Sequence, residues 1–521
     1  MLAIVAYFCL VVTPGCAIAI AIRPSIYRRP ILLLATAPAF AYALSFASTA
    51  VLDSFGAGPW PGLLIANGVA VVAGAVRFGI HAHRSGRDQT GEDQAGGNQA
   101  GGNDARDHLS DEIRLAHLLL GAAILLGALM WLAPGKPSVP MNGDVQNHAH
   151  FITRIIEEDS VDPSVVIAEN PIGSSPAASF YPLAAHSTIA VAQMATTQSI
   201  PDLLITWPML SAILSFPCGI FVLARRLMPG RELVAGLASL VASVGAEFPY
   251  FPMYWGGVPF LIAMSLVPGV VALALDAVDS REWSLYTLAA IATAGTVFAH
   301  TSEIAVLAVI LSCLALHDIL NARKAVPLEN ANSLRRVVGS WGVFAGACAL
   351  LLAPTLAAML GATSENSGYE IVADNGFAAA VSTLLGGSTQ PIIGLLGLAG
   401  IAIVIVNRRS SPPGRMRGAL WALGVFALLL LSTLLGGAVW DLLRSVTVPW
   451  YKSWWRLTYN LAILFPLFAA VALDTTRMAI ARSGRYHTRT YLIGISVLAV
   501  VLLAPSAWKT LGRTGVHGQS L

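Results

Sequence analysis

Apolar runs long enough to cross a lipid bilayer recur along the whole chain, and they restrict its possible folds more than any other feature. Two of the first are "LAIVAYFCLVVTPGCAIAIAI" (Leu2–Ile22) and "ILLLATAPAFAYALSFASTAV" (Ile31–Val51). Each has the roughly 20 residues that span about 30 Å of hydrocarbon as a helix. Only 11% of the 521 residues are charged, against about 25% in a soluble protein. The chain is therefore predicted to be a polytopic helical membrane protein.

Windowed hydropathy predicts an all-α transmembrane bundle of about 14 spans. The expected spans lie near residues 2–22, 31–52, 59–80, 115–134, 203–224, 232–248, 257–276, 284–300, 303–320, 337–358, 391–407, 418–440, 458–475 and 490–507.

Lysine and arginine are distributed unevenly over the loops between these spans. One set of loops, which includes "RPSIYRRP" and "NRRSSPPGRMR", holds most of the 31 basic residues. Cytoplasmic loops are enriched in Lys and Arg, so these loops are expected to face the cytoplasm. Both termini and the large loops are then expected outside a plasma membrane. The outer set holds Lys136, Arg154, Arg444, Lys452, Arg456, Lys509 and Arg513.

Composition divides the chain into four expected segments. Residues 1–80 hold three N-terminal spans, interpreted as an appendage to the functional unit. Residues 81–114 include "QAGGNQAGGN", which cannot bury a core and predicts a flexible cytoplasmic linker. The core is expected at 115–475, with extracytoplasmic loops at 135–202, 247–257, 362–390 and 440–456. A final span and an extracytoplasmic tail follow at 476–521.

The first large outer loop, residues 135–202, is expected to contain two helices. In "DVQNHAHFITRIIEED", helical spacing puts Val145, His148, Phe151, Ile152 and Ile155 on one face. "YPLAAHSTIAVAQMAT" is moderately apolar and short for a span, so it is expected to lie along the membrane interface.

Asp144 and His148 are four residues apart at the start of the first of these helices. Helical spacing puts both side chains on one face, where a carboxylate and an imidazole can share proton transfer or bind a divalent cation. Asp144 and His148 are therefore candidate catalytic residues and candidate metal ligands. The alternative is that Asp144 caps the helix, since "NGD" before an amphipathic run is good capping chemistry.

Three further ionisable residues lie in or beside apolar segments. His186 in "FYPLAAHS" is a candidate binding residue, although a single histidine on an apolar helix is more often hydrogen-bonded packing. His300 and Glu303 in "FAHTSE" are three residues apart at an expected helix end. Ionisable groups at membrane depth tend to face a cavity or a partner, so both are candidate binding residues.

Two outer loops are rich in aromatic residues. "VPWYKSWWRLTYN" carries Tyr451 and Trp455 beside two cations, Lys452 and Arg456, which are four residues apart and could bind one anion such as a lipid phosphate. The alternative is an interfacial aromatic belt with snorkelling cations. "EFPYFPMYWGGVP" adds Tyr254 and Trp255, whose rings suit stacking on a sugar or a lipid chain.

A first large outer loop built of two helices with an acidic residue, on a scaffold of many spans, resembles the GT-C superfamily of membrane glycosyltransferases. Four stretches resemble an actinobacterial family of uncharacterised GT-C-like membrane proteins. The resemblance covers about residues 115–475. The stretches are "GDVQNHAHFITRI", "FYPLAAHSTIAVAQM", "FPYFPMYWGGVPFLIAMSLVP" and "PWYKSWWRLTYNLAILFPLFA".

The resemblance implies transfer of a sugar from a polyprenyl-phosphate donor to an acceptor on the outer face. It implies that Asp144 is the catalytic base and that Arg456, with Lys452 second, holds the donor phosphate. Many GT-C members carry an acidic pair, whereas Asn142 and Gly143 precede Asp144 here and the next acid is Glu157. The departure favours a single base, or a base completed by His148.

The function predicted from the sequence is therefore an extracytoplasmic, polyprenyl-phosphate-sugar-dependent glycosyltransferase acting on a cell-envelope glycan or lipid. Membrane lipid, the lipid-linked donor and the acceptor are its expected partners. No cofactor is predicted apart from a possible divalent cation, and no nucleic acid. One alternative is a transporter or flippase of a lipid-linked substrate, and another is a non-catalytic membrane partner in envelope assembly.

Overall fold

The computed structural model describes residues 1–53, 55, 59–89, 103–132, 143–167, 181–324, 331–365, 391–406, 414–435, 437–450 and 452–482. Within these ranges every regular element is a helix and no strand occurs. Ten of the described helical segments are long and apolar enough to cross a membrane. The predicted class, a polytopic helical membrane protein, is confirmed.

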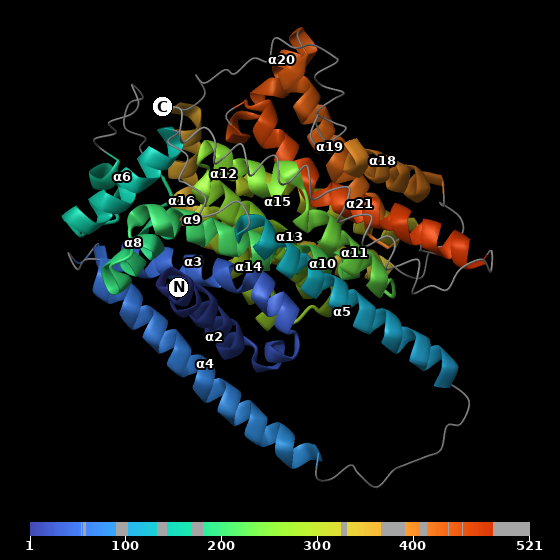
Figure 1. Ribbon diagram of the computed structural model, residues 1–521, viewed down its shortest axis with the longest axis horizontal. Helices are drawn as coiled ribbons and strands as arrows, with labels where there is room; N and C mark the ends of the chain where they lie inside the picture. The colour runs from blue at the N-terminus through green and yellow to red at the C-terminus, as the bar shows by residue number, and fades with distance from the viewer. Residues whose placement is uncertain are drawn as a thin grey trace.

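The helices pack as one bundle, and their order is shown in Figure 1. The first half of the chain forms α1 (Leu2–Tyr7), η1 (Phe8–Val12), α2 (Thr13–Ile22), η2 (Pro24–Arg28), α3 (Pro30–Asp53), α4 (Pro59–Gln89), α5 (Asn103–Leu132), α6 (Gly143–Glu158), α7 (Pro163–Val166), α8 (Ala184–Thr196), α9 (Ile200–Leu210), η3 (Ser211–Ser215), α10 (Phe216–Leu227), α11 (Glu232–Ser243), η4 (Ala246–Tyr250) and α12 (Phe251–Trp255). The second half forms α13 (Val258–Ser280), α14 (Trp283–Ala299), α15 (Glu303–Lys324), α16 (Ala331–Glu365), α18 (Pro391–Val406), α19 (Met416–Leu434), α20 (Ala438–Ser445), η7 (Val448–Trp450) and α21 (Trp454–Arg482).

Thirteen of the expected spans coincide with these helices, and the fourteenth, near 490–507, lies outside the described residues. Three of the thirteen are shorter than the ten candidate spans: Glu232–Ser243, Trp283–Ala299 and Ile392–Val406.

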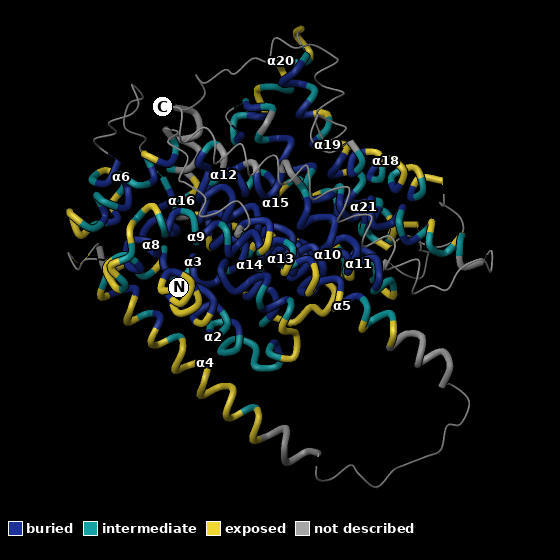
Figure 2. Tube along the Cα trace, viewed as in Figure 1, coloured by how far each residue is buried: buried dark blue, intermediate teal, exposed yellow. Residues whose placement is uncertain are grey.

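Helix α13 forms the centre of the bundle. It packs against α3, α9, α10, α14, α15 and α16, and its apolar window is completely buried (Figure 2). Its sequence is apolar on all sides, which is the pattern of a helix surrounded by other helices rather than of one with a solvent face. By contrast, α4 lies at the edge of the bundle and is largely exposed.

The first three spans, interpreted from the sequence as an appendage, pack against the rest of this bundle. Helix α3 packs against α8, α10, α13 and α14. A Cβ added to Gly295 would lie 1.8 Å from the carbonyl oxygen of Ala39, and one added to Gly269 would lie 2.9 Å from the Cβ of Ala35. Small residues therefore let α3 approach its neighbours closely, as is common between membrane helices.

The predicted linker, residues 81–114, is shorter in the structure. Helix α4 continues to Gln89 and α5 begins at Asn103, so helix covers both ends of the segment. Residues 90–102 lie outside the described residues. Helix α21 likewise continues to Arg482, beyond the expected boundary at 475.

Both helices predicted in the first large outer loop are present, as α6 and α8. The predicted apolar face of α6 is buried at all five positions. Helix α8, however, does not lie along an interface: its residues from Ala184 to Ala192 are all buried. The buried part of α8 consists mostly of small residues, and the hydroxyl groups of Ser187 and of Ser45 in α3 are hydrogen-bonded at 3.0 Å. The helix therefore fits inside the bundle.

Candidate functional site

Asp144 and Arg456 come together in space. The Oδ2 atom of Asp144, in the first turn of α6, lies 3.9 Å from a terminal guanidinium nitrogen of Arg456, in the first turn of α21. The Asp144 side chain is 41% exposed and that of Arg456 is 12% exposed. The carboxylate is therefore accessible, whereas the cation beside it is held by surrounding groups.

Aromatic rings hold the Arg456 guanidinium. Its carbon lies 4.8 Å from the ring centre of Trp255 in α12 and 5.9 Å from that of Phe260 in α13. The indole N–H of Trp255 donates a hydrogen bond of 3.1 Å to the hydroxyl oxygen of Tyr459, which is one turn after Arg456 in α21. Cation–π attraction and this bond fix the guanidinium against α12.

The turn after α12 positions α6. Gly256 has φ +83°, in the left-handed region that favours glycine. A Cβ at this position would lie 2.2 Å from Cγ2 and 2.9 Å from the amide nitrogen of Val145. The glycine backbone therefore packs directly against the first turn of α6, which carries Asp144.

The environment of Asp144 alters its acidity. Partial burial raises the pKa of the Asp144 carboxyl above its ordinary value, and the positive charges of Arg456 and His300 oppose that rise. A carboxylate with a raised pKa is a stronger base and therefore accepts a proton more readily. Because α6 begins at Gly143, Asp144 lies inside the first turn. There its negative charge interacts favourably with the positive end of the helix dipole and stabilises the helix. A helix-stabilising role and a role at the site are thus compatible.

His148 is bonded to His186 rather than to Asp144. His186 Nε2 and His148 Nδ1 are 3.0 Å apart and both residues are buried. Burial, with help from the charges of His300 and Arg456, lowers the pKa of His148 to about 3. Burial and the neighbouring His148 and His300 lower the pKa of His186 well below its ordinary value. The pair is neutral at pH 7, and His186 also packs against the rings of Phe151 and Tyr181.

His300 and Glu303 form a second buried polar group beside these residues. His300 lies in the break between α14 and α15, where its Nδ1 is 2.8 Å from Oε2 of Glu303 and 2.9 Å from the hydroxyl oxygen of Ser302. Its ring meets Phe260 edge-on at 5.5 Å. Phe260 therefore contacts both Arg456 and His300, which joins this group to the Asp144–Arg456 pair.

The remaining predicted residues have different outcomes. Lys452 does not share a helical face with Arg456, because α21 begins at Trp454 and Lys452 lies before it with φ +51°. The spacing argument fails because Lys452 and Ser453 lie outside the helix that carries Arg456. Tyr451 and the side chains of Tyr254 and Trp455 lie outside the described part of the structure.

The described residues do not provide a set of ligands for the predicted divalent cation. Those residues contain no group of three or more His, Cys, Asp or Glu side chains that could hold a metal ion. Asp144 faces Arg456 and the Nδ1 atom of His148 faces His186, so these candidates do not converge on one point.

Two polar residues near Arg456 were not predicted from the sequence. Ser453 immediately precedes α21, and Asn460 lies one turn after Arg456 on the same face. Both side chains are buried, and among the described residues neither the Ser453 hydroxyl nor the Asn460 amide has a hydrogen-bond partner. Buried polar groups are normally satisfied, so these are candidate ligand donors. Both residues lie in "KSWWRLTYN". The prediction for this stretch considered only its aromatic residues and its two cations.

The model of a family described as a family of unknown function, DUF6541, matches residues 8–519. The matched range includes α6, α12, α13 and α21, and so every element of the candidate site. No curated protein matches the chain.

Proposed function

We propose that this chain, which belongs to the DUF6541 family of unknown function, is a GT-C-type membrane glycosyltransferase. It would transfer a sugar from a polyprenyl-phosphate donor to a cell-envelope glycan or lipid on the outer side of a plasma membrane. The observation that supports this most is the 3.9 Å approach of the Asp144 carboxylate to the Arg456 guanidinium.

The proposed reaction needs one base and one fixed cation. Asp144 accepts the proton of an acceptor hydroxyl group while that oxygen attacks the anomeric carbon of the donor sugar. The bond between the anomeric carbon and the phosphate oxygen breaks, and its electron pair leaves with the polyprenyl phosphate. Arg456 stabilises the charge on that phosphate, because its guanidinium is already oriented by Trp255 and Phe260.

The polar groups beside Arg456 support the same assignment. The Ser453 hydroxyl and the Asn460 amide lack partners among the described residues, and both can donate hydrogen bonds to phosphate oxygens. They lie on either side of Arg456 at the N-terminal end of α21, where the helix dipole also favours an anion. The Arg456 guanidinium, the Ser453 hydroxyl, the Asn460 amide and the helix N-terminus thus all favour binding of a phosphate here.

Lipid attachment of the donor accounts for the position of the site. Arg456 is the first residue of the candidate span Arg456–Ile480, and Phe260 is in the first turn of the candidate span Val258–Ser280. Both residues are therefore at the ends of spans, at the depth where a lipid phosphate is found. On the proposed orientation this end faces outward and both chain termini lie outside.

The test is sugar transfer by the purified full-length chain from a radiolabelled polyprenyl-phosphate sugar to envelope glycan or lipid extract. Asp144→Asn should lower the rate by about 10²-fold or more, the usual contribution of a general base. Asp162→Asn is the matched control, since Asp162 caps α7 in the same loop and its substitution should change the rate less than about twofold.

Two outcomes would count against the proposal. Transfer that survives Asp144→Asn would overturn the assignment of the base. Absence of transfer from every polyprenyl-phosphate sugar tested, by wild-type protein that keeps its melting temperature, would overturn the glycosyltransferase assignment itself.

A further inference from the structure

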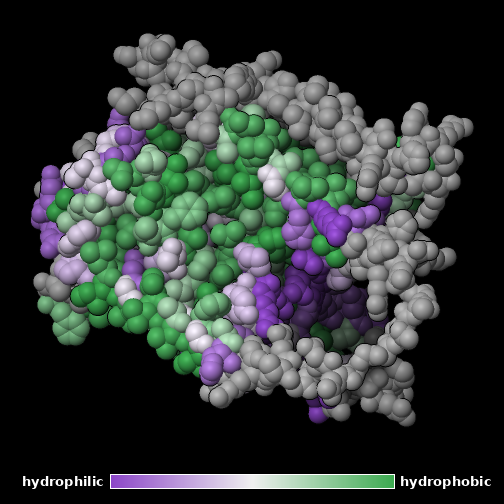
Figure 3. Space-filling view, turned by 60° about the horizontal axis from the view of Figure 1, so that its bottom comes forward, coloured by the Kyte–Doolittle hydropathy of each residue, from purple (hydrophilic) through white to green (hydrophobic). Residues whose placement is uncertain are grey.

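A second polar site lies away from Asp144. On one face of the molecule, hydrophilic side chains gather around a hollow, while much of the surrounding described surface is hydrophobic (Figure 3). A cavity of about 520 Å³ is lined by residues of η2, α3, α5, α10, α11 and α13. Four arginines line it: Arg28, Arg29, Arg225 and Arg226.

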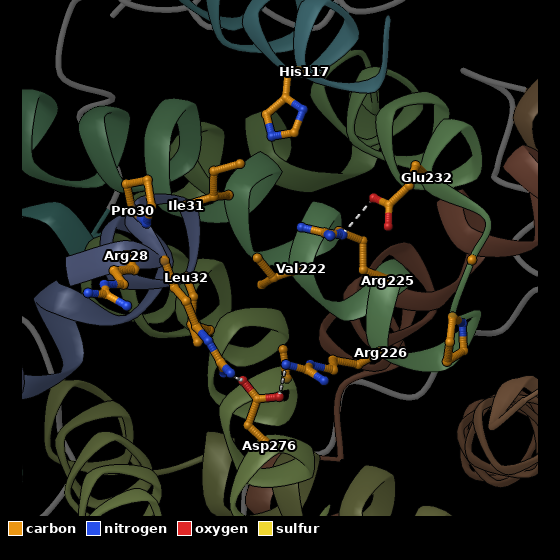
Figure 4. A pocket seen from close by; sticks show the side chains of 14 residues that line it. Arg28, Pro30, Ile31, Leu32, His117, Val222, Arg225, Arg226, Glu232 and Asp276 are labelled. Carbon is orange, nitrogen blue, oxygen red and sulfur yellow. Dashed lines mark hydrogen bonds and ion pairs between the residues drawn. The ribbon is translucent and has the colours of Figure 1, made fainter. Parts of the chain in front are cut away.

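Buried acids hold three of these arginines. Arg29 and Arg226 both contact Asp276 of α13, the former at 2.8 Å, and Arg225 lies 2.7 Å from Glu232. The Asp276 and Glu232 side chains are only 3% and 12% exposed, whereas the three arginines are 38–44% exposed. The acids therefore lie behind the guanidinium groups and fix them, and part of each cation stays open to the cavity (Figure 4).

The cavity has an excess of positive charge. Its lining contains four arginines and two acids, so its formal charge is +2. Arg28 contributes to this excess and contacts the hydroxyl oxygen and ring of the adjacent Tyr27. His117 of α5 lies on another side of the same cavity. Guanidinium groups held in fixed positions are well suited to bind phosphate through paired N–H donors.

The cavity lies at the ends of candidate membrane spans. Arg28 and Arg29 lie between the spans Leu2–Ile22 and Pro30–Thr49, while Arg225 and Arg226 are in the last turn of Ile200–Leu227. Ile31, Leu32 and Val222 provide an apolar part of the wall. Basic pockets between membrane helices at this depth bind anionic lipid head groups.

The cavity is separate from the candidate active site. Phe260 contacts Arg456 near the start of α13, whereas Asp276 is near the end of the same helix. Sixteen residues separate them, which is about 24 Å along a helix. One phosphate group therefore cannot contact both sites.

We propose that this arginine cavity binds the phosphate or pyrophosphate group of an anionic membrane amphiphile on the side of the bundle opposite to Asp144. The volume is within the about 300–1,000 Å³ of ligand pockets and exceeds the needs of a single phosphate. The same chemistry would accept a free phosphate anion, so the experiment separates the two sources.

The test measures binding to the full-length chain in nanodiscs of neutral phosphatidylcholine. One arm titrates inorganic pyrophosphate by calorimetry. The other adds dioleoyl phosphatidylglycerol to the nanodiscs and counts the anionic lipids retained by native mass spectrometry. Neither arm needs turnover, so the result does not depend on the glycosyltransferase proposal.

Variants remove the charges without stranding a buried acid. Arg28→Gln should weaken binding about tenfold, and Arg28→Gln combined with Arg225→Gln and Glu232→Gln about 100-fold, since the loss of one charge-assisted hydrogen bond lowers affinity about tenfold. Arg29 and Arg226 are left in place because they neutralise buried Asp276. The control is Arg323→Gln, an exposed arginine in the last turn of α15, which should leave both arms unchanged.

Each result decides the proposal. Retention of phosphatidylglycerol that depends on Arg28 supports an amphiphile as the ligand. Binding of pyrophosphate alone, with no lipid retained, would overturn the amphiphile and leave a site for a soluble phosphate anion. Equal affinities of wild type and Arg28→Gln in both arms, or no binding in either, would overturn the phosphate site.

Discussion

The Asp144 carboxylate lies 3.9 Å from the Arg456 guanidinium, although one residue is in the first turn of α6 and the other is in the first turn of α21, the last described helix. The approach depends on Gly256, which lets the turn after α12 touch α6, and on Trp255, which stacks on Arg456. The turn between α12 and α13 therefore links the two halves of the site.

Replacing Arg456 with lysine should separate charge from geometry. Lysine keeps the positive charge but loses the planar guanidinium that lies over Trp255 and can bind phosphate through two bonds. We expect Arg456→Lys to lower kcat/KM for sugar transfer by about 10²-fold, the usual loss for one oriented donor. Arg154→Lys in α6, whose partner is the more exposed Glu158, is the control and should retain activity. Full activity of Arg456→Lys would show that charge alone suffices.

Gly256→Ala should displace α6 as well as strain the backbone. Its Cβ would lie 2.2 Å from Val145. Gly230 has a similar φ of +80° and open space around it, so Gly230→Ala isolates the strain of about 1 kcal/mol or more. We expect both variants to lower the melting temperature, but only Gly256→Ala to reduce sugar transfer strongly. Similar transfer rates in the two variants would contradict the proposed role of the turn.

The hydrogen bond between Trp255 and Tyr459 should be measurable as a coupling energy. Trp255→Phe keeps an aromatic ring beside Arg456 but removes the indole N–H, and Tyr459→Phe removes the acceptor oxygen. A double-mutant cycle on unfolding in detergent should give a coupling of about 1 kcal/mol, the net contribution of one hydrogen bond. Additive effects of the two substitutions would mean that the bond contributes nothing to stability.

Acidification should destabilise the protein through the buried histidine pair. The folded pKa of His148 is about 3 and its ordinary value is 6.5, so between these values the unfolded chain binds more protons. Stability then rises with pH across this window and falls as pH decreases below 6.5. At pH 5.5 the loss from His148 is about 1.4 kcal/mol. The difference in melting temperature between His148→Gln and wild type should therefore shrink or reverse from pH 7.5 to 5.5; a constant difference would contradict the assignment.

Sequence periodicity predicted the elements of the site better than their surroundings. The buried face of α6 follows from the spacing of Val145, His148 and Phe151, because an amphipathic helix has one apolar side whatever it packs against. The packing of α3 against α13 and α14 could not be predicted in this way. Hydropathy identifies a span but not its neighbours, and the close contacts of Ala35 and Ala39 with glycines depend on both partners.

In the candidate site, too, single residues could be predicted from the sequence but their packing partners could not. Asp144 was predicted from its spacing with His148, and Arg456 from its spacing with Lys452. The GT-C resemblance implied one site for Asp144 and Arg456, and the structure brings them together. The pairing of His148 with His186 was not predicted, because it depends on how α6 packs against α8. Lys452 was misplaced since its left-handed backbone ends the helical spacing on which the argument relied. Arg28 and Arg225 were read only as orientation signals, although they line a cavity.

The burial of α13 also has an electrical consequence. Between Phe260 and Asp276 its one polar side chain is Ser265, whose hydroxyl donates to the carbonyl oxygen of Leu261 in the same helix. Within α13, these residues offer no chain of charged groups between the two ends of the helix. A membrane potential of 100 mV would fall across this column and change the energy of a unit charge moved between its ends by about 2.3 kcal/mol. Phosphate groups bound at the two ends would therefore experience different electrical potentials within one protein.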